Sequence, residues 1–188
     1  MNSMPSSTAN RPHQALAAAL ASVFPPQRLI SDPLRTLAYG TDASFYRLIP
    51  QIVVIVETEA EVATLLRLCR QHETPVTFRA AGTSLSGQAV SDSVLAVLGD
   101  GWGGIAIAPD AATVRLRPGV IGSDANRALS PFRRKIGPDP ASINACKVGG
   151  IAANNASGMC CGTAQNSYRT LISMRIILAD GTLDLLQR

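Results

Sequence analysis

Residues Pro75–Gly87 read P-V-T-F-R-A-A-G-T-S-L-S-G, and the rest of the chain can be interpreted from this stretch. An apolar run of β type, Val76 to Phe78, leads to one basic side chain, Arg79, and then to a loop of small residues. Small residues let the backbone approach a ligand closely, and their amides and hydroxyls can donate to anionic oxygens. The stretch therefore predicts a strand followed by a phosphate-binding loop. The donors expected in the loop belong to Gly82, Thr83, Ser84 and Ser86.

The residues before this stretch complete a strand–helix–strand unit. Gln51–Val56 is a continuous apolar run, which is typical of a strand that is covered on both faces. Thr58 and Glu61 form a capping box, which opens a helix with an apolar stripe. Two strands joined through a helix are expected to be parallel, with a right-handed crossover. Ligands bind such sheets beyond the carboxyl ends of the strands, where the Arg79 loop lies. The stripe consists of Val62, Leu65, Leu66 and Cys69.

The rest of the chain is organised differently. Further strands are expected at 94–98, 104–108, 113–117 and 171–179, with a short helix near 123–129. Asp180-Gly181 is a strong hairpin signal that leads into a strand over 182–186. Towards the N-terminus, helices are expected at about 12–23 and 33–38, the second with Ser31 or Asp32 as its N-cap. The prediction is an α+β fold of two α/β subdomains, a small parallel βαβ sheet followed by a mainly antiparallel sheet with helices.

The composition excludes several classes of protein. The 188 residues are 46% hydrophobic, 16% charged and 4% aromatic, which describes a compact protein rather than a disordered one. The net charge of +4 is scattered and few aromatic residues accompany it, so nucleic acid is not an expected partner. The four cysteines include no CxxC pair, which argues against a zinc knuckle or a secreted disulfide framework. Ala15–Val23 is apolar but short, and Pro25-Pro26 ends it, so an amphipathic helix is favoured over a membrane span.

Two familiar phosphate-binding motifs can be tested against the loop. The Walker loop requires GxxxxGK[ST], in which the lysine reaches the terminal phosphates. Gly82 and Gly87 have its glycine spacing, but Gln88 stands where the lysine is required, which argues against a nucleotide hydrolase. The Rossmann fingerprint GxGxxG is absent, because the glycines of 101–104 have another spacing.

Residues 137–162 form a second stretch of small residues, G-P-D-P-A-S-I-N-A-C-K-V-G-G-I-A-A-N-N-A-S-G-M-C-C-G. Gly149-Gly150 suits backbone that packs against a large flat ligand, and Ser142, Asn154 and Asn155 can hydrogen-bond a heterocycle or a ribityl chain. Long ordered loops inside compact domains are usually functional. The alternative is a run of tight turns that pack on one another.

Together the two stretches resemble the FAD-binding domain of the p-cresol methylhydroxylase and vanillyl-alcohol oxidase flavoprotein family. The branch they resemble most is that of the D-lactate, glycolate and D-2-hydroxyglutarate dehydrogenases. The family's first loop reads R-G-x-G-T-S-x-x-G, and its second reads P-D-P-x-S, then a T-I-G-G-like step, then A-x-N-x-x-G. The matching residues here are Arg79–Gly87 with Ala80 in place of glycine, Pro138–Ser142, Lys147–Gly150, Ala153, Asn155 and Gly158. The resemblance runs from about residue 31 to the end, and 146–162 are most similar to the long members with a C-terminal iron–sulfur region.

The resemblance implies where FAD would bind. The first loop would cradle the pyrophosphate, the second stretch would run along the ribityl chain and the isoalloxazine, and the backbone of Ile177 would meet the adenine. If Ala80 or Ala81 required a positive φ, the loop would shift at a cost of about 1 kcal/mol. Some members attach FAD through a histidine where this sequence has Thr83, so the FAD is expected to be non-covalent; no metal ligand is expected. The implied cofactor-binding residues are Arg79, Ala80, Ala81, Gly82, Thr83, Ser84, Gly87, Pro138, Asp139, Ser142, Lys147, Gly149, Gly150, Ala153, Asn154, Asn155, Gly158 and Ile177.

The resemblance also implies a reaction, the oxidation of a D-2-hydroxy acid of the D-lactate, glycolate or D-2-hydroxyglutarate class with hydride transfer to the flavin N5. In this family the base and the substrate-binding cations come largely from a cap domain further along the chain. We expect an N-terminal tail and helix over 1–30 and a FAD-binding domain over 31–188 that is C-terminally incomplete and has no cap domain. No catalytic residue is therefore assigned. The alternative is a non-catalytic or truncated flavin-binding module without turnover of its own.

The remaining expectations concern partners and single residues. The electron acceptor would be a quinone, a cytochrome, a flavoprotein or an iron–sulfur region encoded downstream. The expected location is the cytoplasm, with association to the cytoplasmic side of the membrane left open. His13 is expected at the surface, His72 at the exposed end of the second long helix, and Cys146 as a small buried packing residue. The basic run 133–135 is expected to be a solvated turn rather than a substrate clamp.

Overall fold

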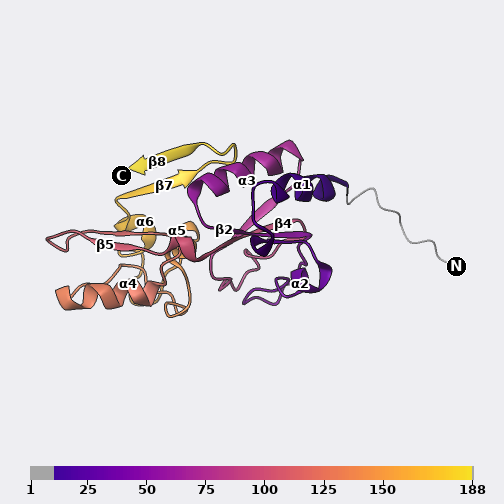
Figure 1. Cartoon of the computed structure of the whole chain (residues 1–188). Helices are drawn as coiled ribbons and strands as arrows, with labels where there is room; N and C mark the ends of the chain where they lie inside the picture. Colours follow the sequence, from indigo (N-terminus) through magenta and orange to yellow (C-terminus); the bar gives the residue numbers. More distant parts are fainter. Residues whose placement is uncertain (1–10, 188) are drawn as a thin grey trace.

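The computed structural model describes residues 11–187, and its first part is a sheet in the order β1–β2–β4–β3 (Figure 1). β2 (Ile52–Val56), β4 (Val94–Leu98) and β3 (Val76–Arg79) run parallel, and β1 (Leu29–Ile30) is antiparallel to β2. The predicted parallel βαβ unit is confirmed, with β4 placed between its two strands. Most of the expected N-terminal tail lies outside the described residues.

Both faces of this sheet are buried. The helices α1 (Arg11–Ala21) and α3 (Glu59–Gln71) pack on one face together with Ile52, Val54 and Val56 of β2, while Val53 faces the second core cluster on the other side. The helix α2 (Pro33–Leu37) lies on that other side in Figure 1. Because α1 shares the main core, residues 11–30 belong to the same packed body as the domain that was expected to begin at residue 31.

The helix α3 shows why the local sequence predicts its own structure. Thr58 is the N-cap, and its hydroxyl accepts a hydrogen bond from the Glu61 amide at 3.2 Å, as the capping box predicts. The predicted apolar stripe is buried. Each fully buried leucine in such a stripe contributes about 1.5–3 kcal/mol. Burial also raises the pKa of the Cys69 thiol to about 11, so this thiol stays protonated and acts as a packing group.

The second part of the chain is antiparallel, as predicted, and the α+β fold class is confirmed, but its strands form two hairpins. β5 (Ile105–Ile107) pairs with β6 (Val114–Leu116), and β7 (Ser173–Ile177) pairs with β8 (Leu183–Gln187), both antiparallel. Within the described residues these are two separate two-stranded sheets, whereas one mainly antiparallel sheet was expected. The residues between the hairpins form helices and loops and add no strand. Gly181 has φ +85° in the turn of the second hairpin, which agrees with the Asp-Gly signal.

Short helices occupy the segment between the two hairpins. These are α4 (Gly122–Leu129), α5 (Val148–Ala153) and α6 (Ser167–Thr170). The 3-10 helices are η1 (Pro26–Arg28), η2 (Asp100–Trp102) and η3 (Ser130–Phe132). The second small-residue stretch is thus a helix flanked by turns rather than a loop throughout. Nowhere in the described part of the chain is a helix both long and apolar enough to cross a membrane.

Candidate cofactor-binding site

The carboxyl edge of the first sheet brings three connections together. β2, β4 and β3 are parallel, so Glu57, Gly99 and Ala80, which follow them directly, start from the same edge. In open α/β sheets ligands bind outside this edge. The second part of the chain lies beyond it in Figure 1, so the edge faces that part.

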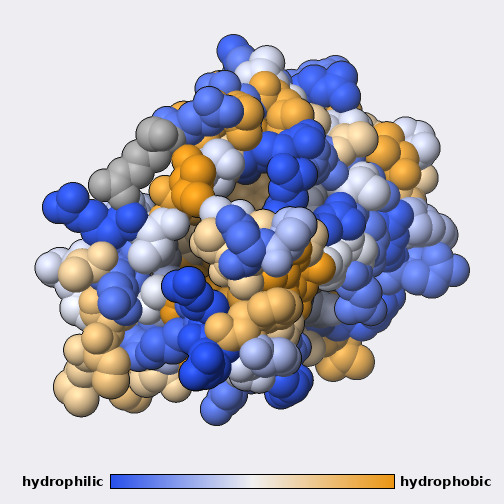
Figure 2. Space-filling model, turned by 90° about the vertical axis from the view of Figure 1, so that its left-hand side faces the viewer, coloured by the Kyte–Doolittle hydropathy of each residue, from blue (hydrophilic) through white to orange (hydrophobic). Residues whose placement is uncertain are grey.

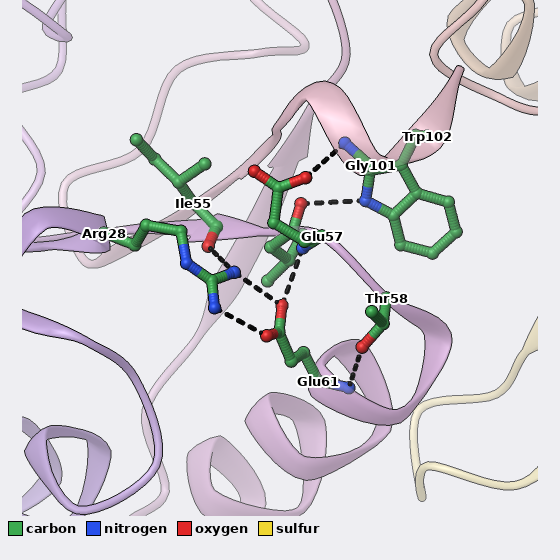
Figure 3. Close-up of polar contacts among 8 residues, drawn as sticks. Arg28, Ile55, Glu57, Thr58, Glu61, Gly101 and Trp102 are labelled. Atoms are coloured by element: carbon green, nitrogen blue, oxygen red, sulfur yellow. Dashed lines mark hydrogen bonds and ion pairs between the residues drawn. The ribbon is translucent and has the colours of Figure 1, made fainter.

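A polar cluster fixes one corner of this edge (Figure 3). The Glu57 carboxylate accepts a hydrogen bond from the Gly101 amide, and the Trp102 indole donates to the carbonyl of Val56 at 2.8 Å. Gly101 has to be a glycine, because a Cβ there would lie 2.6 Å from the Glu57 carbonyl oxygen. The helix η2 is therefore held rigidly against the end of β2.

An ion pair supports the same corner from the N-terminal side. Arg28 donates to both carboxylate oxygens of Glu61 at 2.7 and 2.8 Å, and Glu61 also accepts the Glu57 amide at 2.7 Å. The hydrogen bond from Arg28 lowers the pKa of Glu61, and that to Glu61 raises the pKa of Arg28. Charge pairing thus ties η1, the end of β2 and the first turn of α3 together.

Arg79 points into the protein rather than towards a ligand. Its side chain donates to the carbonyl of Ala89 at 2.8 and 2.5 Å and to the carbonyl of Tyr39 at 3.0 Å, and the residue is only 9% exposed. Burial lowers the pKa of Arg79, and the nearby negative charge of Asp42 opposes this shift. The guanidinium therefore holds the loop closed from within, whereas the sequence suggested a basic side chain delivered into the loop.

The loop after Arg79 presents free backbone donors. The amides of Gly82, Thr83 and Ser84 donate to no other group among the described residues, and Gly82 has φ +70°. Successive amides next to a left-handed residue form a nest that binds anions. Ser84 uses its hydroxyl inside the loop, because this oxygen accepts the amides of Ser86 and Gln88 and donates to Gln88 Oε1. The backbone amides are thus left free to bind a ligand, and the Ser84 hydroxyl shapes the loop.

A segment that the sequence marked only as a loop supports the nest from behind. Ala43 donates to the carbonyl of Gly82 at 2.9 Å, and Asp42 accepts the amide of Ala89 at 3.2 Å. Tyr46 lies against Gly87, where a Cβ would be 2.7 Å from Cδ2 of the ring. Burial acts to raise the pKa of Asp42, but hydrogen bonds from Ser44 and Ala89 and the charge of Arg79 outweigh it, so the pKa is lowered. Asp42 and Tyr46 were missed because no motif marks them.

The second stretch builds the opposite wall from close backbone contacts. Gly149 donates its amide to the carbonyl of Pro118 at 2.9 Å, and a Cβ on Gly149 would lie 2.7 Å from Cβ of Pro118. Lys147 donates its ammonium to the carbonyl of Leu98 at 3.1 Å, which ties the start of α5 to the end of β4. Gly149 is therefore required for the packing of α5 against Pro118, whereas a Cβ on Gly150 would make only an ordinary contact with Ala80.

Asp139 and Asn155 close the second stretch upon itself. Asp139 accepts the Cys161 amide at 3.3 Å through Oδ1 and faces Lys135 Nζ at 3.6 Å through Oδ2. Asn155 has φ +46° and accepts the Tyr168 amide at 3.2 Å. These side chains thus have internal partners. Pro138 and Ser142 lie in the same folded segment, where Ser142 accepts two amides through its carbonyl, and Gly158 packs against the backbone of Asp139.

The two predicted segments meet. Gln88 donates from Nε2 to Oδ1 of Asn154 at 3.0 Å, and a Cβ on Gly150 would lie 3.6 Å from Cβ of Ala80. Ala80 and Ala81 have negative φ, so alanine can stand in place of glycine there and the loop does not have to shift.

Ile177 lies away from these two segments, beside the start of α3. A pocket of about 230 Å³ there is lined by Glu59, Ala60, Ala63, Ile177, Gly181 and Leu183. Ala153, at the end of α5, precedes Asn154 directly.

Some of the remaining single-residue predictions agree with the structure and one does not. Cys146 is buried and residues 133–135 are exposed, as predicted. His13 is half-buried rather than at the surface, because its Nε2 lies 2.8 Å from the hydroxyl of Ser93. His72 caps the C-terminus of α3. Since Ser93 precedes β4 and His72 precedes β3, both histidines lie at the amino edge of the sheet, opposite the candidate site.

The end of the molecule that lies to the left in Figure 1 is hollowed near its centre, and apolar side chains are visible in and around the hollow (Figure 2). Several large apolar side chains of the C-terminal segment are more than 40% exposed. They are Tyr168, Ile172, Leu178, Leu183, Leu185 and Leu186.

Comparison with known proteins agrees with this geometry. The family model described as the FAD binding domain matches residues 50–185. The glycolate oxidase subunit GlcD of Escherichia coli K12 is 31% identical over 87% of this chain, and D-2-hydroxyglutarate dehydrogenase of the same strain is 32% identical over 65% of it. The chain spans about a third of the first relative's length (33%) and 12% of the second's.

Solved structures share the fold. Alkyldihydroxyacetonephosphate synthase superposes with a TM-score of 0.76 at 17% identity over 100% of this chain and 37% of its own, and 6-hydroxy-D-nicotine oxidase from Arthrobacter nicotinovorans with 0.73 at 16% identity over 85% and 35%. The parallel sheet with its small-residue loop, the second wall at α5 and the family match lead to one conclusion: the chain belongs to the FAD-binding domain family.

Proposed function

We propose that the chain binds FAD non-covalently, with the pyrophosphate over the amides of Gly82, Thr83 and Ser84, and forms the flavin-binding part of a dehydrogenase that oxidises a D-2-hydroxy acid. The observation that carries the proposal is the set of amides without a partner among the described residues in the loop after β3, a loop that the Gln88–Asn154 hydrogen bond joins to the end of α5. Charge supports it too, because Arg79 and Lys147 leave their positive ends close to the carboxyl edge of the sheet.

The substrate class rests on the names of the relatives. The chain is similar to a glycolate oxidase subunit, to D-2-hydroxyglutarate dehydrogenases and to a D-lactate dehydrogenase (cytochrome) of Saccharomyces cerevisiae, the last at 28% identity over 71% of this chain. All three names carry a 2-hydroxy acid. Each relative extends well beyond the matched region, so the specific acid and the electron acceptor are part of the proposal.

The chain's own residues would position the cofactor. Bound flavin supplies a hydride acceptor at N5. The nest at Gly82–Ser84 would hold the diphosphate, and the Ser84 hydroxyl would keep the nest in shape by accepting the two following amides. Tyr46 and Asp42 would hold the loop in place, because Tyr46 lies against Gly87 and Asp42 accepts the Ala89 amide.

One experiment tests the proposal in two steps. Titration of the purified, flavin-free chain with FAD should show saturable quenching of flavin fluorescence with one FAD per chain, and acid precipitation should release all the flavin into the supernatant. A chain that fails to bind FAD would overturn the proposal, and flavin retained in the precipitate would overturn its non-covalent part.

The second step separates a dehydrogenase from a module without turnover. D-lactate, glycolate and D-2-hydroxyglutarate would be added anaerobically to the flavin-loaded chain, and bleaching of the flavin absorbance would be followed. The position of both histidines at the amino edge favours the module for this chain on its own, since no imidazole among residues 11–187 lies at the site. Bleaching by one of the acids would show that this chain suffices for the reductive step.

A further inference from the structure

One amide side chain joins the two walls of the candidate site. Gln88 accepts the Ser84 hydroxyl through Oε1 at 3.1 Å and donates through Nε2 to Oδ1 of Asn154 at 3.0 Å. Its own backbone amide also donates to the Ser84 hydroxyl at 3.2 Å. The chain Ser84–Gln88–Asn154 therefore runs from the nest to the end of α5.

The partners of Gln88 fix which way its amide faces. The Ser84 oxygen already accepts two backbone amides, those of Ser86 and Gln88, and so it has its proton left to give. Within residues 11–187 the acceptor of that proton is Oε1 of Gln88, which leaves Nε2 on the side of Asn154. If the Gln88 amide were flipped, Nε2 would face the Ser84 oxygen, which already accepts two amides. Oε1 would then face Asn154 Oδ1, which is also an acceptor.

The orientation of the Gln88 amide determines the orientation of the Asn154 amide. With Oδ1 occupied by Gln88, the Nδ2 group is turned to the other side, and within the described residues it donates to nothing. Asn154 is exposed and follows α5, next to the Gly150 backbone that approaches Ala80. A side-chain amide can present either a donor or an acceptor to a ligand, and here the relay leaves the donor.

We propose that Gln88 is a positioning residue that sets the Asn154 amide with its N–H groups towards the cofactor, so that the site accepts a hydrogen-bond acceptor oxygen of FAD at this point. The inference rests on the proposed function. It assigns to Gln88 a role that the failed Walker match left open, because the lysine position of that motif is here used to orient a neutral donor.

A double-mutant cycle tests the relay. Gln88→Glu keeps the shape of residue 88 and can still receive the Ser84 proton, but its second oxygen would turn Asn154 so that Nδ2 is consumed and Oδ1 faces the ligand. We expect Gln88→Glu to weaken FAD binding about 10- to 100-fold, since a lost hydrogen bond and an opposed acceptor are each worth about a factor of 3 to 10. In an Asn154→Ala background the same change should weaken binding by no more than about threefold, which is the effect of the added charge alone.

Two further measurements guard the interpretation. Gln88→Met removes the relay without a charge and is expected to weaken FAD binding about threefold, while the melting temperature of the FAD-free chain stays within about 2 °C, because the bond is exposed. Repeating the cycle with ADP locates the acceptor: a penalty that persists with ADP puts it on the pyrophosphate half, and one seen with FAD alone puts it on the flavin half.

The results that would overturn the inference are distinct from failure of the proposed function. A Gln88→Glu penalty that is equal in the wild-type and Asn154→Ala backgrounds reduces the effect to charge and removes the relay. Equal FAD affinity of Gln88→Glu and the unaltered chain would do the same. If the unaltered chain itself binds no FAD, the proposed function fails first and the inference falls with it.

Discussion

At the scale of single residues, the candidate site separates side chains that hold the loop from groups that are free to bind. Arg79 looks like a phosphate ligand in the sequence, yet its guanidinium is bonded to two backbone carbonyls and faces Asp42. A basic side chain that is used inside the protein supports the shape of an anion site rather than contacting the anion. The free amides of Gly82 and Thr83 are left for that contact.

This assignment predicts that Arg79 matters before any cofactor binds. Arg79→Met should lower the free energy of unfolding of the FAD-free chain by about 2–4 kcal/mol, because it leaves one buried and one half-buried carbonyl without a donor and Asp42 without its counter-charge. Urea denaturation measures the change. Arg67→Met is the matched control, since the bonds of Arg67 stay within α3, and it should change stability by less than about 0.5 kcal/mol. If Arg79→Met kept its stability but lost FAD affinity, the result would contradict this assignment and show that the guanidinium contacts the phosphate directly.

Two loop glycines give a graded prediction. Both have φ +70°, but a Cβ on Gly82 would meet Arg79 at an ordinary 3.4 Å, whereas one on Gly87 would lie 2.7 Å from the Tyr46 ring. Gly82→Ala should therefore cost about 1 kcal/mol of stability and Gly87→Ala about 2–3 kcal/mol. Adding Tyr46→Ala to Gly87→Ala should recover only the steric part. Equal costs at the two positions in thermal unfolding would contradict this account.

At the scale of elements, the corner between η1, β2 and α3 depends on one partly exposed ion pair. The side chains of Arg28 and Glu61 are 24% and 20% exposed, so water screens the pair less than it would at the surface. The geometry is bidentate, which is the strongest arrangement for this kind of pair. The pair therefore ties the N-terminal segment to the capping turn of α3.

The ion pair predicts how stability depends on pH. The pKa of Glu61 is lower in the folded protein than its ordinary value of 4.5, so protonation favours unfolding. Its contribution is complete above about pH 4.5 and is lost as the pH falls through the lower, folded-state pKa. Glu61→Gln should lose about 1–2 kcal/mol at pH 7, and its difference from the unaltered chain should vanish in acid. Glu73→Gln, at an exposed turn, serves as the control; a difference that is constant with pH would refute the linkage.

At the scale of the whole molecule, the local elements could be predicted and the long-range contacts could not. A few consecutive residues are enough to recognise the apolar run of β2, the capping box of α3 and the Asp-Gly hairpin. The inward turn of Arg79 and the backing by Asp42 depend on partners 40 and 47 positions away, which no local pattern encodes. The meeting of the two small-residue stretches was predicted only through the family resemblance, and Gln88–Asn154, 66 positions apart, joins them.

A ligand between the two parts should stabilise both together. If FAD binds only the folded chain, a concentration of about 100 times the dissociation constant should raise the free energy of unfolding by about 2.7 kcal/mol. Differential scanning calorimetry with and without FAD measures the shift, and adenosine serves as a control that lacks the pyrophosphate. A melting temperature that rises equally with adenosine would place the binding energy away from the nest.

Amide NMR can show whether the amides of Gly82, Thr83 and Ser84 hold the pyrophosphate of FAD. In a ¹H–¹⁵N spectrum of the labelled chain, these amides should move strongly downfield as FAD is added, together with those at the end of α5, while amides of the β5–β6 hairpin stay in place. Saturable binding of FAD that leaves the Gly82–Ser84 amides unmoved would contradict the account, because the cofactor would then lie elsewhere.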